Sequence, residues 1–162
     1  MKGDKLENPK VFKNFISSAL LSVDWSQDSS NLAVVSQAYE LQFANLDGRV
    51  SASSVREARW ATWTGKFGAC VQEIHQDVDY SNINAVDMSP SRTLIATGGD
   101  DQKIRLFNYP AIVPKQKNKE FIGHSSHVTR VRFSNTERNL LSVGGNDRTI
   151  ILWEVKGIAE EE

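Results

Sequence analysis

Apolar and polar residues alternate along several short stretches of this chain, most clearly in residues 123–153. Apolar positions recur through 128–133 (VTRVRF), and apolar runs follow at 140–143 (LLSV) and 149–153 (TIILW). An alternation of period two buries one face of an extended segment and leaves the other in water. A buried helix could explain one of these runs, but not several at fixed intervals with Gly144-Gly145 between them. The pattern therefore predicts three β-strands joined by tight turns.

The same pattern occurs more than once. Asp147 stands six residues before Trp153, and Asp101 stands six residues before Phe107. The two copies are offset by 46 residues (101 to 147), close to the roughly 40–45 residues of one propeller blade. A weaker third copy begins at Val23, 63 residues before Val86 in the middle copy (23 to 86). The longer offset predicts an insertion between residues 45 and 82.

This repeat predicts an all-β fold, a β-propeller or an arc of one, with about three visible blades. We expect a single domain over residues 1–162, with repeats at about 12–45, 66–108 and 119–155. Closed propellers use roughly four to eight blades. The chain is therefore expected to be part of a larger propeller or to complete its ring with another chain. Unpaired blade edges would then favour self-association.

Individual elements follow from the same pattern. We expect an outer strand at 12–15, an inner strand at 20–25, and two strands within the insertion, at 59–64 and 67–74. Glycine pairs and the Asn146-Asp147 step lie between apolar runs, and such residues adopt positive φ readily. They are expected to provide the left-handed backbone of the hairpin turns.

Gly123-His124 at the start of the last repeat and Trp153 at its end resemble the marks of the WD-repeat family. That resemblance implies a hydrogen-bond network within one blade, from Trp153 to Ser142, to His124 and to Asp147. A Ser–His–Asp set would also suit a hydrolase triad. However, Ser142 lies in a predicted strand and no GxSxG elbow is present. A buried structural network is therefore favoured.

The middle repeat keeps Thr97 and Asp101 but has Phe107 in place of tryptophan and no preceding Gly-His. Its network is therefore expected to be incomplete.

Two stretches narrow the family further. Residues 57–64 (EARWATWT) lie in the insertion, and residues 123–129 (GHSSHVT) open the last blade. With 24–26 (DWS) and 39–41 (YEL), they are similar to the C-terminal blades of the echinoderm microtubule-associated protein-like family, over about residues 15–155. The resemblance implies a cytoskeletal protein with tandem propellers that contact tubulin, preceded by a coiled coil. Neither a coiled coil nor a first propeller is recognisable in this sequence.

This chain also departs from the family pattern at two positions. Ala38 stands where the blade turn usually has Asp, and Ala44 stands where an aromatic residue is expected. These departures are expected to weaken the polar network of the first blade while leaving its fold in place.

Composition excludes some functions and favours others. The formal net charge is −1, which argues against a nucleic-acid binder with a basic stripe. No apolar run approaches the roughly 20 residues of a membrane span, and no secretory signal is recognisable. The single cysteine, Cys70, excludes an internal disulfide and suits a reducing compartment. A cytoplasmic, cytoskeletal location is expected, with ciliary microtubules as one option.

The insertion holds the candidate residues for partner contact. Arg56, Arg59 and Lys66 flank Trp60 and Trp63, and Trp and Arg are enriched at interaction hot spots. One interpretation is a site for an acidic partner. The other is that both tryptophans anchor the insertion on the blade and the basic residues are simply solvated.

Catalytic, cofactor and metal sites are not expected. Cys70 and His75 could form a thiolate–imidazole pair, but a lone cysteine is more often a small apolar residue. Three histidines and one cysteine give no zinc spacing, and the glycine pairs lack the following helix of a phosphate site. The sequence therefore predicts a protein–protein interaction module of a microtubule-associated assembly, with tubulin or microtubule-associated proteins as partners. A WD-repeat scaffold without a cytoskeletal role and an enzyme remain the alternatives.

Overall fold

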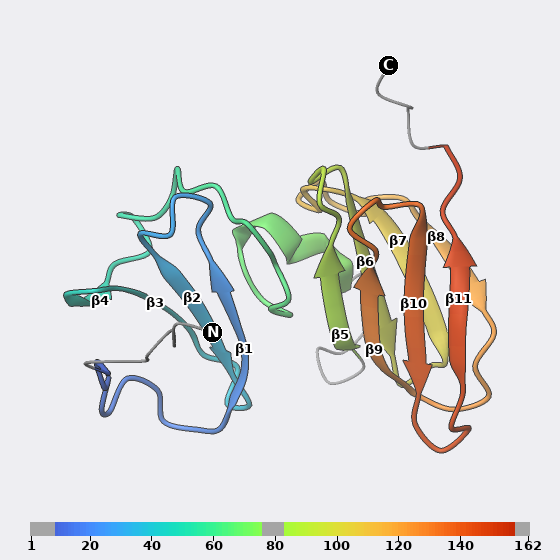
Figure 1. Cartoon of the computed structure of the whole chain (residues 1–162), viewed down its shortest axis with the longest axis horizontal. Helices are drawn as coiled ribbons and strands as arrows, with labels where there is room; N and C mark the ends of the chain where they lie inside the picture. Colours follow the sequence, from blue (N-terminus) through green and yellow to red (C-terminus); the bar gives the residue numbers. More distant parts are fainter. Residues whose placement is uncertain (1–8, 76–82, 158–162) are drawn as a thin grey trace, which may run out of the picture.

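The strands form antiparallel sheets that follow one another along the chain (Figure 1). The computed structural model describes residues 9–75 and 83–157, and these form three sheets. The first contains β1 (Leu20–Trp25), β2 (Leu32–Ser36), β3 (Leu41–Asn45) and β4 (Gly48–Val50). The second contains β5 (Ile83–Met88), β6 (Leu94–Gly99), β7 (Lys103–Asn108) and β8 (Asn118–Ile122). The third contains β9 (Val128–Phe133), β10 (Asn139–Gly144) and β11 (Ile150–Glu154).

Each sheet is a meander in which neighbouring strands pair in sequence order. The first strands of the second and third sheets, β5 and β9, pack against each other, as the innermost strands of adjacent propeller blades do. The prediction of an all-β propeller arc is confirmed, and the strand predicted at 20–25 is β1.

The turn after each inner strand is built in the same way in all three blades. A serine at its start accepts a hydrogen bond through Oγ from the main-chain amide five residues later; these serines are Ser26, Ser89 and Ser134. Three residues after each serine, φ is 59°, 60° and 59°, at Ser29, Arg92 and Glu137. None of these is glycine, so the hydrogen-bonded turn itself holds the left-handed backbone. The three blades therefore share the geometry of this turn as well as the order of their strands.

In the turn between the second and third strands of each blade, the predicted position of the left-handed backbone was wrong. Positive φ falls on Tyr39, Gln102 and Arg148, not on the glycine pairs or the Asn-Asp step. Gly144 is required for a different reason, because a Cβ there would overlap the Asp147 carboxylate. The glycine provides room for a close approach, and the hydrogen-bonded turn again accommodates a residue with a side chain.

Two apolar clusters fill the spaces between neighbouring blades. The smaller cluster lies between the second and third sheets and joins Ala85, Ala96 and Ile104 to Val128, Val131 and Leu140. The larger cluster lies between the first and second sheets, and residues of the insertion supply much of it: Val55, Trp60, Trp63, Val71 and Ile74. The insertion therefore belongs to the core between two blades.

The strands predicted at 12–15, 59–64 and 67–74 were wrong. Residues 12–15 form no strand. Residues 59–61 pair with the end of β1 only through Gln27 N donating to Arg59 O (2.6 Å) and Ala61 N donating to Trp25 O (2.9 Å). Residues 69–75 form the 3₁₀ helix η1 (Ala69–His75), whose Val71 and Ile74 are buried. Val71 has non-helical backbone angles (φ −132°, ψ 23°), so η1 is kinked at this residue.

The two ends of the arc leave apolar side chains in solvent. In β1, Leu21, Val23 and Trp25 are exposed. By contrast, Val86 of β5, which corresponds to Val23, is buried against the first blade. At the other end, Ile150 and Leu152 of β11 are 71% and 66% exposed. Both faces are therefore shaped like blade-to-blade contacts but have no neighbouring blade in the described part of the chain.

Candidate protein-interaction surface

The structure joins the four residues of the predicted network in the last blade. Ser142 Oγ accepts a hydrogen bond from Trp153 Nε1 (2.8 Å) and lies 2.7 Å from His124 Nε2. On the other side of the ring, His124 Nδ1 lies 3.0 Å from Asp147 Oδ2. Ser142 is fully buried. Because no substrate could reach its hydroxyl, this arrangement suits a structural network and not an acyl-transfer site.

One further member was missed by the sequence reasoning. Thr149 Oγ1 lies 2.9 Å from His124 Nδ1, and its main-chain amide also donates to Asp147. Burial alone would raise the pKa of Asp147, but the hydrogen bonds from His124, Thr149 and Ser125 hold that pKa below its usual value. Thr149 stands two residues after Asp147 in the sequence, and this spacing could have identified it as a member of the network.

The middle blade has a different polar arrangement. Thr97 is buried, but Asp101 forms an ion pair with Arg105, which also contacts Glu120 at 2.9 Å. Lys103 contacts the same Glu120 at 2.6 Å. This partly exposed ion cluster ties β7 to β8, and Phe107 is buried in place of the tryptophan.

The tryptophans of the insertion lie in the protein interior. Trp63 is 2% exposed and Trp60 is 8% exposed, and their rings meet edge to face with centroids 5.2 Å apart. They fill the space between the first and second blades, so the partner-contact interpretation was wrong for these two side chains. Large aromatic side chains contribute most to stability when they are removed from water, and the space between the two blades buries both rings.

The three cations of the same prediction differ in exposure. Arg56 and Arg59 are exposed. Lys66 is half-buried, and burial lowers its pKa while nearby Asp100 opposes that effect. Lys66 lines a groove along the inner strands. The two arginines therefore remain as fully exposed candidates, whereas Lys66 faces the groove.

That groove has a volume of about 420 Å³ and runs along the inner strands β1, β5 and β9. Besides these strands, its wall includes Lys66 and His127. Arg130 and Arg132 of β9 also line it. Sequence reasoning missed this site, because it is assembled from three blades.

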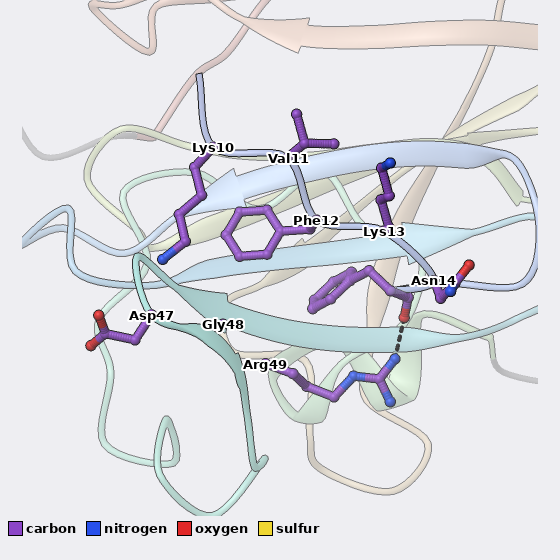
Figure 2. Close-up of a pocket in the computed structure, with 9 residues that line it drawn as sticks. Lys10, Val11, Phe12, Lys13, Asn14, Asp47, Gly48 and Arg49 are labelled. Carbon is purple, nitrogen blue, oxygen red and sulfur yellow. Dashed lines mark hydrogen bonds between the residues drawn. The ribbon is translucent and has the colours of Figure 1, made fainter. Parts of the chain in front are cut away.

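A second groove, of about 440 Å³, lies between residues 10–15 and the β3–β4 turn (Figure 2). Arg49 stacks over the ring of Phe15 at 5.2 Å and donates a hydrogen bond to the Phe15 carbonyl. Lys10 lies 5.9 Å from the ring centre of Phe12. The two contacts of Arg49 hold the strand-free residues 10–15 against β4 of the first blade.

Cys70 is not an activated nucleophile. Burial raises the pKa of its thiol to about 11, and a hydrogen bond with Tyr109 only partly offsets that effect. His75, the proposed partner, has Nε2 2.6 Å from the Lys66 carbonyl oxygen, and burial lowers its pKa. The thiolate–imidazole pair considered from the sequence is therefore not formed.

Residues 9–75 and 83–157 contain no group of three or more His, Cys, Asp or Glu side chains placed to hold a metal ion. Within these same ranges, no helix has the length and apolar character needed to cross a bilayer.

The meandering sheets, the repeated serine turns and the His–Ser–Trp network define this chain as a WD-repeat β-propeller segment. A family model described as the echinoderm microtubule-associated protein second beta-propeller matches residues 3–155. The chain belongs to this family, and the resemblance seen in the sequence is confirmed.

Named relatives agree with the family model. The chain is 39% identical over 143 residues to the 77 kDa echinoderm microtubule-associated protein of Strongylocentrotus purpuratus. It is 37% identical over 143 residues to echinoderm microtubule-associated protein-like 2 of Homo sapiens. These matches cover 86% of this chain but only 21% and 22% of the relatives. The chain thus spans about a fifth of the length of these relatives.

Proposed function

We propose that this chain is a protein–protein interaction module of a microtubule-associated assembly, with tubulin or a tubulin-binding protein as its partner. The observation that carries the proposal is the match of residues 3–155 to the second propeller of the family. The relatives are named as microtubule-associated proteins. Propellers present rigid surfaces to partners, and the role proposed here is non-catalytic and located on cytoskeletal microtubules.

Arg56 and Arg59 are the proposed surface contacts within the insertion. Both are exposed, and the buried tryptophans hold this segment between two blades. The net charge of the chain is −1, so attraction to an acidic protein requires a local cationic patch. Exposed ion pairs each contribute under about 1 kcal/mol. The affinity is therefore expected to be modest and to fall with added salt, since the Debye length is about 10 Å at 0.1 M.

Microtubule co-sedimentation at two salt concentrations tests the proposal. The wild-type chain should pellet with microtubules, and less of it should pellet at the higher salt concentration. An Arg56→Glu/Arg59→Glu variant should bind more weakly, mainly because association slows. The matched control is Lys117→Glu/Lys119→Glu, which makes the same charge change at two other exposed positions and should bind like the wild type.

Two results would contradict parts of this proposal. If the wild-type chain stays in the supernatant at both salt concentrations, a scaffold without a cytoskeletal role becomes the better interpretation. If the folded double-arginine variant pellets as the wild type does, the microtubule contact lies outside the insertion.

A further inference from the structure

The groove along the inner strands is rigidly built. Its walls are β1, β5 and β9, together with Val35 of β2, His127, and Thr64 and Lys66 of the insertion. β9 packs directly on β5, and Asp24 fixes Thr64 through hydrogen bonds to its amide and hydroxyl. A groove with such walls needs little reordering to accept a ligand, which lowers the entropic cost of binding.

The charged side chains that line the groove have one sign. Lys66, Arg130 and Arg132 are cationic, and none of the described residues lining the groove carries a carboxylate. Arg132 contacts Asp87 at 2.6 Å, yet its side chain is 55% exposed. Arg130 donates a hydrogen bond to the carbonyl of Thr129. Within residues 9–75 and 83–157, it forms no ion pair with a carboxylate. Asp87 offsets the charge of Arg132, and Asp100 acts on Lys66. Arg130 is therefore the lining cation at which the groove most favours an anionic ligand.

A polar atom on the groove wall has no partner. Ser22 Oγ is buried from solvent and has no hydrogen bond in the described part of the chain. Ser22 belongs to β1 and lines the groove. An unsatisfied buried hydroxyl costs free energy, and a ligand acceptor reaching this wall would relieve that cost. The groove thus offers cations and one uncommitted hydroxyl.

We propose that this groove binds a short acidic peptide segment of a protein partner. The inference rests on the proposed interaction function and specifies a surface for it. The volume of about 420 Å³ falls within the roughly 300–1,000 Å³ of ligand sites, which suits a few residues and not a folded domain. Carboxylate side chains would pair with Arg130, Arg132 and Lys66, and apolar parts of the segment would contact the exposed Leu21 on the groove wall.

Fluorescence anisotropy of a labelled oligoglutamate peptide, with an oligoglutamine peptide of equal length as comparison, tests the groove. The wild-type chain should bind the first peptide and not the second. Arg130→Glu should weaken binding by about tenfold or more, because it replaces attraction with repulsion. The matched control is Arg138→Glu, an exposed cation in the turn between β9 and β10, which should change binding by less than about twofold.

Lys66 is half-buried, so a reversal there could disturb folding. Lys66→Met keeps the apolar stem, removes the charge, and should also weaken peptide binding. Circular dichroism and thermal unfolding of every variant would show that the fold is retained.

Three outcomes would overturn the inference. These are no binding of oligoglutamate by the wild type, an equal loss in Arg130→Glu and Arg138→Glu, or equally good displacement by a single-stranded oligonucleotide of the same charge. Co-sedimentation of the same variants separates the two proposals: microtubule binding without peptide binding rejects the groove alone. Peptide binding without microtubule binding rejects the microtubule role alone.

Discussion

The carboxylate of Asp24 accepts a hydrogen bond of 2.9 Å from the main-chain amide of Thr64, 40 residues further along the chain. In the next blade, the equivalent Asp87 accepts a hydrogen bond of 2.7 Å from the amide of Phe133 in β9. The segment around Thr64 thus takes the position beside β1 that an inner strand takes beside β5. The same carboxylate fixes the neighbouring segment in both cases.

Replacing Asp24 should destabilise the junction between the first two blades. Asp24 is 1% exposed and also accepts hydrogen bonds from the Thr62 hydroxyl and the Gly65 amide. Asp24→Ala would leave these donors unpaired, and we expect a loss of about 3 kcal/mol or more in the free energy of unfolding. Urea titration measures it, with the exposed Asp47→Ala as control. Equal unfolding midpoints for the two variants would refute the assigned role.

Ser142→Ala tests the network of the last blade. The change removes the shared partner of His124 Nε2 and Trp153 Nε1. Leaving these buried groups unsatisfied should cost about 1–3 kcal/mol, measured by chemical denaturation. Ser125→Ala, at an exposed position in the same blade, should have almost no effect. The network would carry no stability if both substitutions behaved alike.

Gly68 should not tolerate a side chain. Its φ is +147°, and a Cβ would overlap the indole ring of Trp63. Gly48 has φ +149°, and a Cβ added there would meet nothing within 4 Å, so Gly48→Ala isolates the backbone strain of about 1–3 kcal/mol. Gly68→Ala should lower the melting temperature further, by the added overlap. A smaller loss at Gly68 than at Gly48 would show that the Trp63 packing is loose.

The thiol of Cys70 should react slowly near neutral pH. Its pKa is raised to about 11 from an ordinary value of 9.0, so thiolate is scarce. Between these two values the folded state retains the proton that the unfolded state has lost. The stability contributed by the buried thiol is therefore complete below about pH 9 and is lost as the pH rises toward about 11.

Labelling rates and unfolding curves between about pH 7 and about pH 11 check this expectation. Cys70→Ser should remove the part of the alkaline destabilisation that the thiol causes. Rapid labelling of the folded wild type at neutral pH would contradict the burial argument and reopen a nucleophilic role.

The exposed apolar faces at the ends of the arc should make the chain self-associate. Leu21, Val23 and Trp25 at one end and Ile150 and Leu152 at the other form faces that adjacent blades normally cover. Light scattering after gel filtration should show species larger than a monomer. Ile150→Lys/Leu152→Lys should shift the distribution toward monomer, whereas a wild-type monomer at tens of micromolar would contradict this expectation.

The sequence alone determined the repeating part of this protein. Period-two alternation and the recurrence of Asp101 and Asp147 at fixed intervals indicated the strands and blades, because strand burial depends on local pattern. The resemblance of the last blade to WD repeats also implied its network members His124, Ser142, Asp147 and Trp153, and the motifs at 57–64 and 123–129 pointed to the family.

Only the tertiary structure decided where the insertion goes. Local pattern left open whether Trp60 and Trp63 contact a partner or anchor the insertion on the blade, because their neighbours come from other blades. The same holds for Lys66, which joins Arg130 and Arg132 in one groove across more than 60 residues of sequence. Burial and charge clustering depend on contacts between distant segments, and no local periodicity records those contacts.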